Sequence, residues 1–170
     1  IEDDAIFDFA RQHLHAAVIW SFCETKPETF ADLKAYFQRQ QTFAQNFTAK
    51  GLPCFRLTGI HPRNIPTAEP VSQTKIDALL ESQLNDAKGI GEIGLENGND
   101  LEKAVFAMQL DFAKRHKLKV GIHTPRKNKL AIAPAILEIV EQSGINHDMV
   151  IIDHLDSAPL VWTIVNMGYH

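Results

Sequence analysis

Residues 88–95, KGIGEIGL, form a short apolar run with one carboxylate, Glu92, near its end. A run of this length favours a buried β-strand. The capping-box pattern Asn99-x-x-Glu102 follows, and apolar residues then recur at helical spacing: Leu101, Val105, Met108 and Phe112. A strand that leads into an amphipathic helix is the βα unit from which parallel sheets are built.

The same alternation of strand and helix extends along the chain in both directions. Further strands are expected at residues 16–22, 54–60, 119–123 and 149–154. Helices are expected after the pattern Thr25-x-x-Glu28, around residues 76–84, and over 130–143 and 159–165. We therefore predict an α/β fold of about five parallel strands with intervening helices, in which residues 1–170 form a single domain.

Four polar residues stand at or near the ends of successive predicted strands, each 31 residues after the one before: His61, Glu92, His123 and His154. A TIM barrel places eight βα units in about 250 residues, roughly 31 per unit, with its chemistry at the carboxyl ends of the strands. The period therefore predicts part of a TIM (β/α)8 barrel with these side chains gathered at one end. Imidazole and carboxylate groups suit zinc, manganese or iron. A single histidine at a strand end is more often structural, so the predicted metal site depends on the four together.

The composition excludes several classes of protein. With 45% hydrophobic residues, 170 residues suffice for one buried core. The net charge of −4 and the pI of about 6.0 argue against a protein that coats nucleic acid non-specifically. Cys23 and Cys54 form no CxxC pair, so no disulfide framework is indicated and a cytoplasmic setting is expected. No apolar run approaches the ~20 residues that span a bilayer.

Gly89-x-Gly91-x-x-Gly94 matches the dinucleotide-binding pattern GxGxxG. That pattern must follow a strand and open directly into a helix. Here a predicted helix precedes it, the glycines lie within the apolar run itself, and Glu92 would repel a pyrophosphate. A dinucleotide-dependent oxidoreductase is therefore not indicated.

The residues around the four periodic positions form ordered motifs: Gly59-Ile60-His61-Pro62, Gly91-Glu92-Ile93-Gly94-Leu95-Glu96, Ile122-His123-Thr124-Pro125-Arg126 and Ile151-Ile152-Asp153-His154. In this order and spacing the sequence resembles TatD-related metal-dependent hydrolases of the amidohydrolase superfamily. The resemblance implies a TIM barrel that holds one or two divalent ions (zinc, magnesium or manganese). It implies Glu92, His123 and His154 as metal ligands, with Glu92 able to bridge two ions, and a substrate-facing role for His61.

Two features of that family are not found at their expected places. The family's HxH ligand pair follows its first strand, whereas His13-Leu14-His15 precedes the strand predicted at 16–22 and is expected at the end of a helix. The family's late aspartate, a ligand and proton acceptor, is expected beyond His170, so the catalytic base is unknown. The resemblance thus implies a chain truncated at both ends, and the isolated chain is expected to be inactive.

The resemblance implies hydrolysis by a metal-activated water. A phosphodiester, DNase-like substrate is favoured by the resemblance and by Arg126 and Lys127 on the loop after His123, which are suited to phosphate. The alternative is an amide or lactone hydrolase acting on a small metabolite. It is favoured by the acidic pI and because Arg126 lies three residues after His123, where the family commonly has two. An inactive fragment or pseudoenzyme is the third hypothesis. No membrane partner is expected, and the oligomeric state is not indicated.

Overall fold

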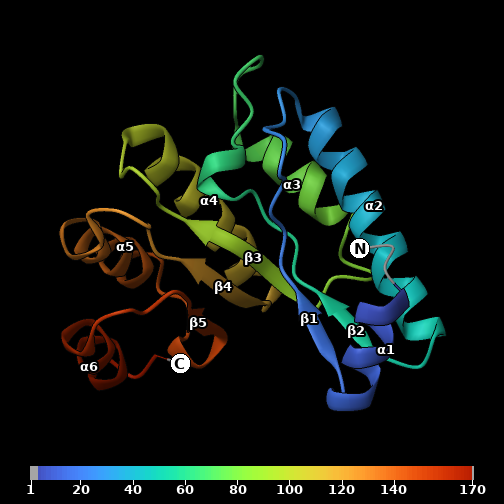
Figure 1. The fold of residues 1–170 in the computed structure, drawn as a ribbon. Helices are drawn as coiled ribbons and strands as arrows, with labels where there is room; N and C mark the ends of the chain where they lie inside the picture. Colours follow the sequence, from blue (N-terminus) through green and yellow to red (C-terminus); the bar gives the residue numbers. More distant parts are fainter. Residues whose placement is uncertain (1–3, 170) are drawn as a thin grey trace.

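The computed structural model describes residues 4–169. In chain order the elements are α1 (Asp4–His13), β1 (Ala17–Ile19), α2 (Phe30–Ala49), β2 (Cys54–Arg56), η1 (Pro62–Asn64), α3 (Gln73–Glu81), β3 (Gly89–Gly94), α4 (Asp100–His116), β4 (Lys119–His123), α5 (Lys129–Ser143), η2 (His147–Met149), β5 (Val150–Ile152) and α6 (Ala158–Asn166). Figure 1 shows α1 and α2 at one end of the molecule, α5 and α6 at the other, and the strands between them. The predicted alternation of strands and helices is confirmed.

The strands pair in parallel throughout the described range. β1 pairs with β2, and β3, β4 and β5 pair in that order. A parallel bridge between Leu57 and Gly89 joins the two groups, and the N–H of Thr58 donates to Gly89 O at 3.1 Å. The five strands thus form an open parallel arrangement, as predicted for part of a β/α barrel. β1, β2 and β5 are shorter than predicted, with three residues each.

The start of α2 differs from the prediction. The helix does not begin at the pattern Thr25-x-x-Glu28. Its N-cap is Thr29, whose side chain accepts the backbone N–H of Asp32, and the Asp32 carboxylate accepts the N–H of Thr29 at 2.8 Å. The Glu69 carboxylate accepts the N–H of Phe30 at 2.6 Å. The later start is favoured because these groups satisfy N–H donors that a helix leaves without internal partners.

The core lies between α4 and the strands β3 and β4. Fully buried side chains from these elements fill it: Ile90, Ile93, Phe106, Leu110, Phe112, Val120 and Ile122. Burial of each large side chain contributes about 1.5–3 kcal/mol. The predicted apolar stripe of α4 includes the buried Val105, but Leu101 in the first turn is 48% exposed. None of the helices within residues 4–169 combines the length and apolar character needed to cross a membrane.

The segment after β1 crosses toward β3 and β4. The N–H of Ser21 donates to Gly91 O at 3.1 Å. Trp20 packs against Gly121 of β4 so closely that a Cβ atom at position 121 would lie 2.2 Å from the indole ring. Only glycine allows this approach without a shift of the ring or the strand. The crossing therefore places the residues after Trp20 beside the carboxyl ends of the central strands.

Candidate metal centre

Four side chains singled out in the sequence lie together near the carboxyl ends of the strands. The buried Glu92 of β3 is central: its Oε1 lies 2.9 Å from Nδ1 of His123 and 3.1 Å from Nε2 of His154. Its Oε2 lies 3.9 Å from Nε2 of His61. Within the described residues, candidate ligand atoms converge to within 4.8 Å in two groups, His61–Glu92–His123 and Glu92–Asp153–His154. Imidazole nitrogens and carboxylate oxygens at this spacing fit a divalent transition metal.

His61 is held as a neutral hydrogen-bond donor. Its Nδ1 accepts the backbone N–H of Arg63 at 3.0 Å, which leaves the proton of the neutral ring on Nε2. Burial, with smaller contributions from nearby charges such as His123, lowers the pKa of His61 to about 3. Because a protonated Nε2 has no lone pair to offer, His61 in this tautomer is not a metal ligand through that nitrogen. It instead presents an N–H toward Glu92.

The position of His61 is fixed by a buried glutamine that the sequence interpretation missed. Gln109 of α4 accepts the N–H of Ile60 at 2.7 Å and donates to Ile60 O at 3.1 Å. The Phe22 ring lies 4.9 Å from the His61 ring, edge to face. Gln109 lies on the buried face of α4, as Glu102 does, but glutamines are mostly exposed, so its position in the sequence does not mark it.

His123 lies between two carboxylates. Its Nδ1 faces Glu92, and its Nε2 lies 2.7 Å from Oε2 of Glu96. The His123 side chain is only 3% exposed and that of Glu96 16%. Glu96 belongs to a motif noted in the sequence, but no role was predicted for it. The available signal was a second carboxylate immediately after the strand that carries Glu92.

His154 lies beyond the end of β5 in a left-handed backbone conformation, with φ of 57°. Such a conformation is costly for a residue other than glycine and needs support. The single Thr124 Oγ1–H is shared between Asp153 O at 2.9 Å and His154 O at 3.2 Å. Lys129 Nζ also donates to His154 O, and lies 2.9 Å from Asp156 Oδ2. Residues of the segment after β4 therefore fix the backbone of the loop that contains His154.

Asp153 and His154 would point to opposite faces if the predicted strand at 149–154 were regular throughout. Because β5 ends at Ile152, both residues instead lie in the loop after it. Asp153 Oδ2 lies 3.7 Å from Nε2 of His154, and its Oδ1 accepts the backbone N–H of His154 at 2.7 Å. Asp153 therefore adds a carboxylate next to the imidazole of His154.

The loop between β3 and α4 is organised by one buried carboxylate, Glu102. It accepts the backbone N–H groups of Glu96, Asn97 and Gly98 at 2.8–2.9 Å, and the side-chain amides of Asn97 and Asn99 at 3.0 and 3.1 Å. Asn99 caps α4 by accepting the N–H of Glu102, as predicted. The Glu102 carboxylate thus holds the loop residues between Glu92 and α4.

Glu102→Gln is expected to lower the free energy of unfolding by about 2–3 kcal/mol, because the amide group turns a donor toward backbone N–H donors and leaves them unsatisfied. Urea unfolding followed by circular dichroism measures this. Glu138→Gln, an exposed change on α5, should stay within about 0.5 kcal/mol of the wild type. Equal stability of the two variants would refute the role of Glu102.

A cavity of about 380 Å³ adjoins His154. It is lined by Thr124, Arg126, Lys129, His154, Leu155 and Asp156. Lys129 is already paired with Asp156, whereas the exposed Arg126 extends a cation to this cavity. Lys127 is exposed and is not among the lining residues.

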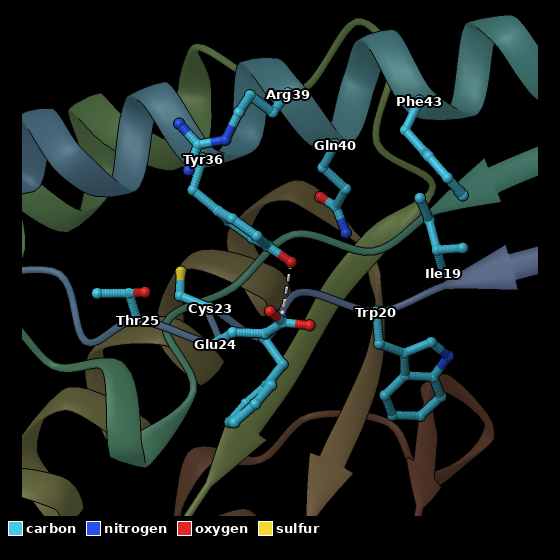
Figure 2. A pocket seen from close by; sticks show the side chains of 10 residues that line it. Ile19, Trp20, Cys23, Glu24, Thr25, Tyr36, Arg39, Gln40 and Phe43 are labelled. Atoms are coloured by element: carbon cyan, nitrogen blue, oxygen red, sulfur yellow. Dashed lines mark hydrogen bonds between the residues drawn. The ribbon is translucent and has the colours of Figure 1, made fainter. Parts of the chain in front are cut away.

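A second cavity, of about 510 Å³, lies between α2 and the segment after β1 (Figure 2). Tyr36 and Gln40 of α2 line it, and Cys23 lies opposite them. Burial raises the pKa of the Cys23 thiol to about 11, so this thiol stays protonated at neutral pH and is a poor nucleophile. The cavity contains none of the candidate metal ligands.

The HxH-like segment lies where it was expected. α1 ends at His13, and β1 begins only at Ala17. His13 and His15 therefore precede the strand rather than follow its carboxyl end.

The sequence profile of the TatD related DNase family matches residues 4–170. The chain belongs to this family. A Methanocaldococcus jannaschii protein named as an uncharacterized metal-dependent hydrolase is 34% identical over 98 residues, which cover 58% of this chain and 38% of that protein. The TatD-like protein of Archaeoglobus fulgidus has a similar structure, with a TM-score of 0.85 at 27% identity over 98% of this chain and 70% of that one.

A second solved TatD homologue, YjjV of Escherichia coli K12, has a TM-score of 0.64 at 20% identity and supports the fold alone. The match covers 97% of this chain and 60% of YjjV. The chain thus spans between 38% and 70% of the lengths of these relatives. The TatD resemblance and the α/β fold predicted from the sequence are confirmed.

Proposed function

We propose that this protein is a divalent-metal-dependent hydrolase that cleaves phosphodiesters, with Glu92, His123 and His154 as metal ligands. The observation that supports it best is the shared oxygen of Glu92, which lies 2.9 and 3.1 Å from nitrogens of two histidines. Family membership and the name of the M. jannaschii relative agree with metal-dependent hydrolysis. When bound, a divalent ion lowers the pKa of a coordinated water and withdraws charge from the scissile group.

The other residues of the centre supply positioning and binding. His61 offers its Nε2–H to an anionic oxygen of the substrate, because its Nδ1 is occupied by the N–H of Arg63. Arg126 supplies the cation of the adjoining cavity and suits a phosphate through paired hydrogen bonds. The buried walls around Glu92 and His123 limit water access and strengthen these interactions.

Hydrolysis assays on the protein expressed from its complete gene test this proposal. Bis(p-nitrophenyl) phosphate and single-stranded DNA are compared with a panel of lactones and amides, with added zinc, manganese or magnesium and with chelator. Metal-dependent turnover of the phosphodiesters supports the proposal. Turnover confined to lactones or amides favours the alternative, an amide or lactone hydrolase acting on a small metabolite. No turnover of any substrate with any metal would contradict both.

Arg126→Ala is expected to raise KM for a phosphodiester about tenfold, equivalent to about 1.4 kcal/mol, with a smaller change in kcat. The reason is the loss of the cation from the cavity beside His154. Lys127→Ala is the matched control, because Lys127 lies on the same loop without lining the cavity. Equal effects of the two variants on KM would indicate only a general electrostatic contribution.

A further inference from the structure

We infer that Glu96 is a positioning residue that fixes the imidazole of His123 so that Nδ1 is the metal-binding nitrogen. The inference rests on the proposed metal centre. Each of the two ring nitrogens of His123 lies close to a carboxylate. Nδ1 is 2.9 Å from Glu92, and Nε2 is 2.7 Å from Glu96. One nitrogen can hold a metal only if the other keeps the proton.

The surrounding donors decide between the two nitrogens. Glu92 Oε1, on the Nδ1 side of His123, also lies 3.1 Å from Nε2 of His154, so this one oxygen lies near two histidines. Glu96 belongs to neither of the groups of candidate ligand atoms that converge within residues 4–169. A metal between His123 Nε2 and Glu96 would therefore lack the carboxylate oxygen that His123 Nδ1 shares with a second histidine. Glu96 is left to accept the Nε2–H of His123.

Glu96 is fixed in position by its own surroundings. Its backbone N–H donates to Glu102 Oε2 at 2.9 Å, and its side chain is mostly buried. A hydrogen bond from an imidazole to a partly buried carboxylate is strong, and it fixes both the tautomer and the ring orientation of a ligand histidine. Loss of such a partner typically weakens metal binding by about 10- to 100-fold.

The test measures zinc affinity by competition with a chromophoric chelator, using the protein expressed from its complete gene. Glu96→Ala is expected to weaken zinc binding by about 10- to 100-fold. Glu96→Gln, which keeps an acceptor oxygen, should recover part of that loss. Glu138→Ala on the exposed face of α5 is the control and should bind zinc like the wild type.

A second measurement reports on the proton of His123. In the zinc-loaded wild type, long-range proton–nitrogen NMR correlations should show His123 with its proton on Nε2 and the metal-shifted resonance on Nδ1. In Glu96→Ala the Nε2 proton should exchange rapidly with water. A merely structural role for Glu96 would leave this resonance unchanged.

These outcomes distinguish a failure of the proposed role of Glu96 from a failure of the proposed metal centre. If the wild type binds zinc and Glu96→Ala binds it equally well, the role of Glu96 is wrong while the metal centre stands. A metal-shifted Nε2 on His123 would likewise overturn the inference and make Glu96 a candidate ligand. If the wild type binds neither zinc nor manganese, the proposed function fails, and the inference fails with it.

Discussion

Glu92→Gln is expected to reduce phosphodiester hydrolysis by about 10³-fold, equivalent to about 4 kcal/mol of transition-state stabilisation. The substitution keeps the volume of the side chain but removes the charge that two imidazoles share. Among the described residues, Glu92 is the carboxylate that pairs with both His123 and His154, whereas Glu96 pairs only with His123 and Asp153 only with His154. The measurement is kcat/KM at saturating metal.

Glu138→Gln is the matched control because it makes the same chemical change on an exposed helix surface. Urea unfolding of both variants ensures that a loss of activity does not reflect a loss of fold. A folded Glu92→Gln protein that keeps wild-type kcat/KM would show that hydrolysis does not depend on this carboxylate.

Gly94→Ala is expected to lower the free energy of unfolding by about 2–4 kcal/mol. Gly94 has φ of 146°, and an added Cβ would lie 2.4 Å from the backbone oxygen of His123. The contact is with backbone, so it is relieved only by separating the ends of β3 and β4. Glu92 and His123 lie on those two strands, and the variant should therefore also weaken metal binding.

Gly98→Ala is the control that introduces left-handed backbone strain without a steric clash. Gly98 also has positive φ, 72°, but an added Cβ would meet only the Ile132 side chain at 3.6 Å or more, an ordinary contact. Its cost should be limited to about 1–2 kcal/mol of left-handed backbone strain. Chemical denaturation of both variants tests the difference. Equal costs would mean that β3 and β4 separate without penalty.

The residues that periodicity could locate are those at or beyond the carboxyl ends of the strands. His61, Glu92 and His123 follow a 31-residue spacing because each βα unit contributes one strand, and parallel strands end at the same edge. His61 and His154 fit the same spacing although both lie beyond the ends of their strands, β2 and β5. The predicted positions of the strands were therefore enough to locate the four residues that lie together at the site.

The supporting groups could not be located in this way. Glu96, Glu102 and Gln109 act through loop and backbone hydrogen bonds that depend on how α4 packs against the strands. Polar residues at helix starts and on helix faces are usually solvated, so nothing in their spacing marks them. The capping pattern Thr25-x-x-Glu28 failed for a related reason, because Thr29 and Asp32 offer a competing cap one turn later. That residues 1–170 form one domain stays a prediction.

Metal content tests the central claim most directly. Elemental mass spectrometry is applied to the protein expressed from its complete gene, purified without chelator and then reconstituted, with Glu92→Ala and His154→Ala beside it. We predict one or two divalent ions per chain in the wild type and their loss in both variants. No bound metal in the wild type after reconstitution would contradict the account, and the four evenly spaced residues would then be structural.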